Sequence, residues 1–211
     1  MKAPFSARIA LLALAGGGAL AGCLRTPPVH YYTIPEDLAQ RASRSGPPLT
    51  PASLRVAAAS VADMLDRPEL VLRVSPTEVR VDDDHRWAEP LRTAIPRVLA
   101  ANLDRSAGGG RVAFAEETGG REIADIITVT VDVRRLDLEL GRQVALEVDW
   151  TARSKDGSLT RSGHTAARAP ATTGGYDGLT AACAKVLVAV SDDISRSLSL
   201  AQGKTVANLQ Q

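Results

Sequence analysis

The sequence predicts a single α+β domain in which a mostly antiparallel β-sheet carries two main helices on one face, behind an N-terminal signal peptide. Three patterns lead to this prediction. Apolar and polar residues alternate over most of residues 126–169, as in a meander of antiparallel strands. Apolar residues recur every three or four positions over residues 87–103 and again over residues 176–200, as in two amphipathic helices.

Residues 1–22 have the layout of a secretory signal peptide. Lys2 and Arg8 accompany an uncharged apolar run over residues 9–21. This run of about 13 residues is shorter than the roughly 20 that a membrane-spanning helix needs. A buried core helix is the alternative, but the three consecutive glycines at 16–18 would weaken it. We therefore expect export from the cytoplasm.

The end of this segment predicts a lipid anchor. Leu20, Ala21, Gly22 and Cys23 resemble the lipobox of bacterial lipoproteins, whose cysteine receives a diacylglycerol and, after cleavage, an N-acyl chain. Two or more acyl chains anchor a protein stably to a bilayer. We expect lipid attachment at Cys23; the alternative is an ordinary signal sequence with an incidental cysteine. Leu24 stands where an aspartate would resemble an inner-membrane retention signal, so we expect the outer membrane, with the domain facing the periplasm.

Residues 23–52 are expected to link this anchor to the domain. Residues 24–30 contain two prolines and form a short tether, and the aromatic and β-branched residues 31–34 predict a first strand. Residues 36–52 are polar and rich in proline, so we interpret them as a flexible loop.

The domain itself is predicted over residues 53–202 and begins with short strands. Strands are expected at residues 53–60 and 69–74, with a hairpin partner for the second at residues 78–81. Three aspartates follow at 82–84, which we interpret as a solvated turn. A further strand is expected over residues 111–116.

A helix is predicted over residues 87–103. Pro90 suits a first helical turn, Asp84 is a candidate for its N-terminal cap, and Pro96 should kink the helix near Arg92. The glycines at 108–110 should end the segment. The expected apolar stripe consists of Trp87, Leu91, Ile95, Val98, Leu99 and Leu103.

The predicted meander contains a change of phase. Apolar residues occupy odd positions from 127 to 133 but even positions from 136 to 140, which a regular strand cannot accommodate. We expect a β-bulge or bend at Arg134 and Arg135. The second and third strands are expected over residues 144–150 and 159–169, with turns near Gly141 and at residues 154–158.

The second main helix is predicted over residues 176–200, and residues 203–211 are expected to form a disordered tail. Cys183 lies on the apolar stripe of this helix, so we expect a buried free thiol. The glycines at 174 and 175 are interpreted as a helix entry loop rather than a phosphate site, because no lysine or acidic ribose partner accompanies them.

The sequence offers no constellation that predicts an enzyme, a metal site or a cofactor. His30, His85 and His164 lie in separate segments, and Gly-x-Ser-x-Gly and phosphate-binding loops are missing. Asp82, Asp83, Asp84 and His85 could suggest a metal site, but consecutive residues of an extended segment point in alternate directions. Residues 1–22 hold two of the 25 basic residues and none of the 24 acidic ones, so the mature net charge is −1. That charge argues against a nucleic-acid partner.

Residues 65–73, "LDRPELVLR", and 86–103, "RWAEPLRTAIPRVLAANL", resemble the ABC-type transport auxiliary lipoproteins, whose best-known type is paraquat-inducible protein C. The resemblance extends over essentially the whole mature chain. Its most specific part is Arg86, Trp87, Ala88, Glu89, Pro90 and Leu91, for which a structural role is expected, with Trp87 in the core and Pro90 at a helix start. The family implies MCE-domain partners, which carry lipids between the two membranes. It supplies no catalytic residues.

Two functions follow as hypotheses. The first is a non-enzymatic docking component of an MCE-type lipid transport system that contributes to envelope integrity, anchored in the outer membrane and expected to be homo-oligomeric. The second is a periplasmic carrier that holds an acyl chain in its own fold, since a bulged sheet can curl around a ligand. An enzyme acting on envelope lipids or peptidoglycan ranks third.

Overall fold

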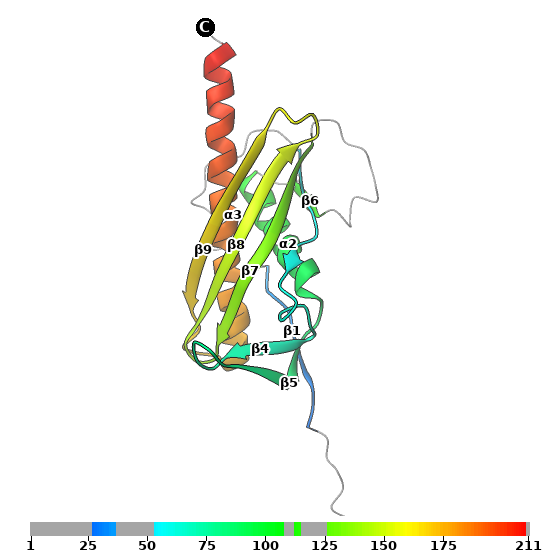
Figure 1. The fold of residues 1–211 in the computed structure, drawn as a ribbon, viewed down its shortest axis with the longest axis vertical. Helices are drawn as coiled ribbons and strands as arrows, with labels where there is room; N and C mark the ends of the chain where they lie inside the picture. Colours follow the sequence, from blue (N-terminus) through cyan, green and yellow to red (C-terminus); the bar gives the residue numbers. More distant parts are fainter. Residues whose placement is uncertain (1–26, 37–52, 108–111, 115–125, 210–211) are drawn as a thin grey trace, which may run out of the picture.

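The computed structural model describes residues 27–36, 53–107, 112–114 and 126–209 (Figure 1). Within these residues, nine strands form one mixed sheet and two helices pack against it, which confirms the α+β class. The strands are β1 (His30–Tyr32), β2 (Ser53–Val56), β3 (Ser60–Val61), β4 (Glu69–Arg73), β5 (Val79–Trp87), β6 (Val112–Phe114), β7 (Ile126–Glu139), β8 (Gln143–Ser154) and β9 (Thr160–Pro170). The helices are α2 (Leu91–Ser106) and α3 (Gly175–Leu209). The predicted signal peptide and all of the predicted 36–52 loop except Glu36 lie outside the described residues.

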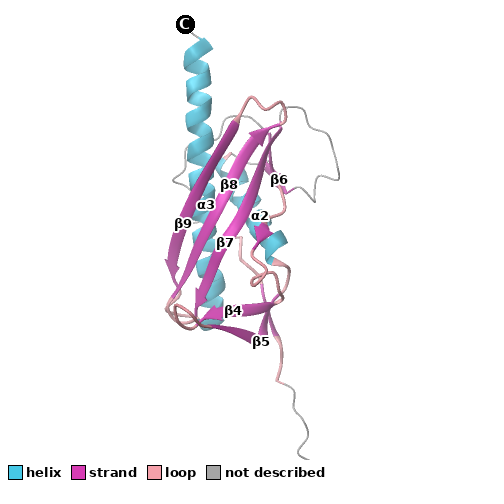
Figure 2. Ribbon diagram, viewed as in Figure 1, coloured by secondary structure: helices cyan, strands magenta, loops and turns pink. Residues whose placement is uncertain are grey.

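The antiparallel pairs join strands that are consecutive in the sequence, and the parallel pairs join strands that are not. β7, β8 and β9 form the predicted meander, and β4 and β5 form the predicted hairpin. β2, β3 and β4 each lie parallel to β7, β2 also pairs with β6, and β1 lies parallel to β5. Figure 2 shows both helices behind the layer of long strands. Their apolar stripes and the inward side chains of β7 and β8 form one core.

The predicted bulge is present in β7. Val133 pairs with Val148, but Arg135 pairs with Glu147, so Arg134 is the additional residue. Leu136 and Leu138 are therefore buried at even positions, although the buried valines before the bulge are at odd ones. The predicted hairpin turns also occur, where Gly141 and Gly157 adopt left-handed backbone angles (φ of 72° and 76°) that other residues rarely adopt.

The region around the three aspartates differs from the prediction. Residues 82–84 are part of β5 rather than a turn, and α2 begins at Leu91 rather than at Trp87, so Asp84 does not cap it. Pro90 occupies the cap position, with φ −58° and ψ 138°. A proline disfavours helical geometry at the preceding residue, so the helix cannot extend back through Glu89. Pairing with β1 keeps Trp87 in a strand instead.

Pro96 lies inside α2 without ending it. A proline cannot donate to the carbonyl four residues earlier, which leaves the carbonyl of Arg92 without its helical partner. That oxygen accepts a hydrogen bond from the backbone N–H of Ala59 at 3.0 Å. The missing helical bond is thus replaced by one that joins α2 to the segment between β2 and β3.

Helix α3 gives the molecule its length. Its 35 residues correspond to about 52 Å at 1.5 Å per residue. Cys183 is buried with 1% exposure, as predicted. The helix continues through residues 203–209, which the sequence led us to place in a disordered tail; this stretch contains the helix formers lysine, alanine and leucine and no proline. Figure 1 shows its C-terminal part projecting beyond the sheet, at the end opposite β1.

Candidate functional site

The predicted attachment residue Cys23 and the lipobox Leu20–Gly22 lie outside the described residues. The first residue that the structure describes is Pro27, and β1 begins three positions later. β1, the β4–β5 hairpin, the β7–β8 turn and the first turn of α3 lie at one end of the molecule (Figure 1). We call this the tether end, because the chain from Cys23 enters there.

The segment Arg86–Leu91 forms the corner between β5 and α2. The N–H of Trp87 donates to the carbonyl of Pro68 (2.7 Å), and the N–H of Ala88 donates to the carbonyl of Tyr32 (2.8 Å). The Trp87 side chain is 5% exposed and Leu91 is 2% exposed, so both are part of the core. The corner therefore holds β1, the first strand of the described residues, against the rest of the domain.

Ion pairs reinforce this corner from the other side. Arg97 on α2 donates through Nε to Glu89 at 3.3 Å, and its terminal nitrogens contact the second oxygen of Glu89 and the carboxylate of Glu36. Glu36 follows β1 by four residues. The same guanidinium thus connects the end of the first described segment with the start of α2.

A surface cleft of about 290 Å³ lies beside the corner. Its lining is apolar at Pro68, Trp87 and Pro90 and is flanked by an ion pair between Arg92 and Asp66 (2.9 Å). The cleft is also lined by Arg67, Ala88 and Glu89. Four of the six residues in the segment most specific to the resemblance therefore line a concave surface.

Aromatic and histidine rings stack at the tether end. The ring of His85 on β5 lies 3.7 Å from that of Tyr176 on α3 and 5.3 Å from that of His30, and Tyr32 lies 5.6 Å from Tyr176. Asp82 accepts hydrogen bonds from the Tyr176 hydroxyl and from Nδ1 of His85 (2.9 Å). These contacts join β1, β5 and α3.

These contacts shift the pKa values of Asp82 and Tyr176. Burial alone raises the pKa of Asp82, but the hydrogen bonds from Tyr176 and His85 outweigh it and bring the pKa below its ordinary value. Burial, together with the Asp82 carboxylate, raises the pKa of Tyr176 to about 12. At neutral pH the tyrosine therefore stays protonated and donates to an ionised carboxylate.

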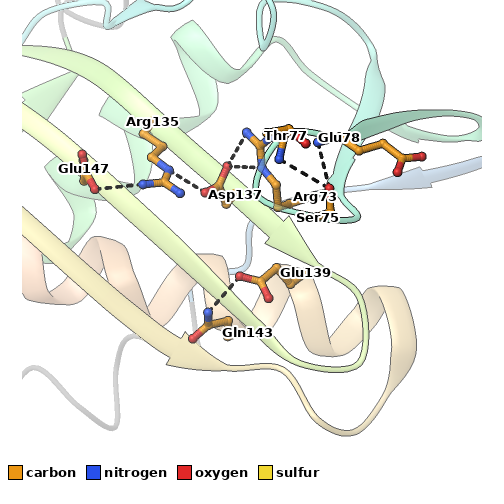
Figure 3. Close-up of polar contacts among 9 residues, drawn as sticks. All are labelled: Arg73, Ser75, Thr77, Glu78, Arg135, Asp137, Glu139, Gln143 and Glu147. Atoms are coloured by element: carbon orange, nitrogen blue, oxygen red, sulfur yellow. Dashed lines mark hydrogen bonds and ion pairs between the residues drawn. The ribbon is translucent and has the colours of Figure 1, made fainter.

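A second charged cluster lies beside the bulge of β7 (Figure 3). Asp137, whose side chain is 4% exposed, accepts from Nε of Arg73 at 3.0 Å and from Nε of Arg135 at 2.5 Å. Arg135 also donates to Glu147 at 3.4 Å. An open cleft of about 470 Å³ borders these groups, with Met64 and Leu65 on its apolar wall. Sequence reasoning missed the cluster because Arg73 and Asp137 are 64 positions apart.

The space between the helices and the sheet is filled. The cavity there measures about 10 Å³ and is lined by Ile34, Ile95, Leu136, Leu146, Cys183, Val186 and Leu187. Sites for small molecules occupy roughly 300–1,000 Å³. The described residues thus leave no room for an acyl chain at that place. Neither of their helices has the length and apolar character to cross a membrane, and none of their His, Cys, Asp and Glu side chains form a group that could hold a metal ion.

Comparison with known proteins identifies the family. The family model for the ABC-type transport auxiliary lipoprotein component matches residues 32–195. The chain belongs to this family. The match begins inside β1 and ends within α3, and it includes the whole Arg86–Leu91 corner.

Solved structures share the fold. A crystal structure of an uncharacterized protein has a TM-score of 0.64 at 21% identity, over 80% of this chain and 97% of that chain. A Xanthomonas campestris protein of the DUF330 family has a TM-score of 0.60 at 18% identity, over 86% of this chain and 98% of that chain. No curated protein matches the chain in a sequence search.

Proposed function

We propose that this protein is an outer-membrane-anchored periplasmic lipoprotein that acts without catalysis as a docking component of an MCE-type lipid transport system and contributes to envelope integrity. The observation that carries the proposal is membership of the transport auxiliary lipoprotein family, combined with a lipobox that ends at Cys23. Acyl chains on Cys23 place the domain on the membrane, and the MCE-domain protein is the partner that it receives.

The position of the anchor supports this proposal. Pro27 is four positions after Cys23, so their Cα atoms lie at most about 14 Å apart at 3.6 Å per position. The tether end therefore stays close to the membrane. Helix α3 extends from that end over about 52 Å, which carries its C-terminal part toward the periplasm. Surfaces far from the anchor are in this way presented to a periplasmic partner.

The alternative, a carrier that encloses an acyl chain, needs space that the core lacks. Both helices close onto the sheet with only about 10 Å³ between them. The bulge at Arg134 serves instead to bring Leu136 and Leu138 into the core. A filled core favours a rigid docking module, for which we expect a homo-oligomer that matches a ring-shaped partner.

The proposal is tested by separating the membranes of cells that lack the gene and of cells complemented with wild type or with Cys23→Ser. We expect the MCE partner to co-fractionate with the outer membrane only when the lipidated wild-type protein is present. Mass spectrometry of the mature chain checks acylation at Cys23 independently. Unchanged attachment of the partner in the deletion strain would refute the docking role.

A further inference from the structure

Exposed apolar side chains gather at the tether end. The large apolar residues exposed in the described part of the chain are Val29, Tyr31, Met64, Val74, Leu140 and Leu200. Four of them belong to the tether end: Val29 and Tyr31 at β1, Val74 directly after β4, and Leu140 in the β7–β8 turn. Single exposed apolar residues are ordinary, but four at the end where the anchor enters are a local concentration.

Val74 and Leu140 lie just past the ends of two neighbouring strands. Leu72 of β4 pairs with Leu138 of β7 in parallel register, and Val74 and Leu140 each follow two positions later. Val74 is 57% exposed and Leu140 is 41% exposed, and both lie at the tips of hairpins. A long cationic side chain accompanies them: Arg142 is 77% exposed and pairs with Glu139 at 2.8 Å.

Tyr31 supplies the second part of this surface. It is 65% exposed, although its neighbours His30 and Tyr32 belong to the ring stack with His85. Successive side chains of a strand point to opposite faces, so Tyr31 faces away from that stack. Tyrosine combines an apolar ring with a polar hydroxyl, which suits the boundary between lipid and water.

We propose that the tether end is a membrane-contact surface, on which Tyr31, Val74 and Leu140 rest against the headgroup region of a bilayer and fix the orientation of the anchored domain. This inference rests on the proposed lipid attachment at Cys23. Val29 is six positions after Cys23, which limits the distance between their Cα atoms to about 22 Å. The anchor thus confines these side chains to the neighbourhood of the bilayer, where burial of apolar surface is favourable.

The charges at this end specify the lipid class. The β4–β5 hairpin, the β7–β8 turn and the first turn of α3 carry seven carboxylates (Glu69, Glu78, Asp82, Asp83, Asp84, Glu139 and Asp177) against four guanidinium groups (Arg73, Arg80, Arg86 and Arg142). An acidic surface gains nothing from anionic lipid. The surface therefore fits a zwitterionic bilayer, and its apolar contacts orient the domain while the acyl chains hold it.

Spin labels on the full lipidated protein test the inference. Single variants Val74→Cys and Leu140→Cys are labelled with a nitroxide and reconstituted in zwitterionic phosphatidylethanolamine–phosphatidylcholine vesicles. Leu200→Cys is the matched control, since Leu200 is exposed and lies 25 positions after the start of α3, about 37 Å along the helix from the tether end. The native thiols do not interfere, because Cys183 is buried with its pKa raised to about 12 and Cys23 is acylated. Collisions with oxygen, which concentrates in lipid, are compared with collisions with a water-soluble nickel chelate.

We expect a higher oxygen-to-nickel collision ratio at positions 74 and 140 than at position 200, unchanged by added anionic lipid and lost on release from the vesicles. Vesicle-bound, acylated protein with equal ratios at positions 74, 140 and 200 would overturn this inference and leave the proposed function standing. If the spectra of labels at 74 and 140 are broadened by labels on other molecules, and the labels are shielded from both reagents, this surface is instead a contact between two copies of the protein. That result would overturn the inference. A chain that is not acylated and does not float with vesicles would overturn both.

Discussion

Replacing Asp82 with asparagine perturbs the contact through which β5 and α3 meet at the tether end. Asp82 is 14% exposed and accepts from Tyr176 on α3 and from His85 on its own strand. Hydrogen bonds to a charged group contribute about 1.5–3 kcal/mol each when shielded from water. Asparagine keeps one acceptor oxygen, and His85 is partly exposed, so we expect a loss of about 1–3 kcal/mol at pH 7.

The stability that Asp82 contributes should depend on pH. The pKa of Asp82 is lower in the folded protein than its ordinary value. The carboxylate therefore contributes stability above about pH 4, and this contribution is lost as the pH falls below that value. The difference in free energy of unfolding between wild type and Asp82→Asn should be full at pH 7 and should shrink toward pH 3.

Urea unfolding of the domain from residue 24 onward, followed by the fluorescence of Trp87 and Trp150, measures this difference. Asp83→Asn is the matched control, because Asp83 is the exposed neighbour on the same strand. A double-mutant cycle with Tyr176→Phe isolates the contact between β5 and α3. Equal stabilities for the Asp82 and Asp83 variants at pH 7 would refute the reasoning.

Three further predictions concern the body of the domain. Asp137→Ala leaves two guanidinium groups without their shared carboxylate and should lower the free energy of unfolding by about 2–4 kcal/mol. The control Asp132→Ala removes an exposed ion pair and should lower it by less than about 1 kcal/mol. Urea unfolding measures both differences. Gly163→Val should destabilise the domain by about 1–3 kcal/mol, because a Cβ there would lie 2.5 Å from the buried Trp150 ring; unchanged near-ultraviolet dichroism would contradict this. Cys183 should react with a thiol reagent only at the rate of unfolding, since burial raises its pKa to about 12; rapid labelling of the native chain would contradict it.

Local patterns were sufficient to predict the elements whose own residues determine them. The stripe through Leu179, Cys183 and Ile194 predicts α3, because a 3.6-residue period has one structural meaning. The change of parity around Arg134 likewise predicts the bulge, because a regular strand cannot change faces. However, an alternating pattern does not indicate which strand is the neighbour. The parallel pairing of Leu54 with Ile127 therefore could not be predicted from the sequence.

The same limit explains the errors near the corner. Trp87 precedes Leu91 by four residues and so fits the helical stripe, although pairing with β1 and the restriction before Pro90 place it in a strand. The contact between Asp82 and Tyr176 spans 94 positions, and no periodicity could bring the two together. Family resemblance identified the corner as specific, but only the fold shows that it joins β1 to the core.

The central claim is that the anchored protein docks an MCE-domain partner. The most direct measurement is flotation of the purified partner with zwitterionic vesicles that carry the acylated protein, against vesicles that carry none and against the soluble Cys23→Ser protein. The proposed function predicts that the partner floats only with vesicles bearing the acylated protein. A partner that stays at the bottom of the gradient in all three cases, or floats equally with empty vesicles, would contradict it.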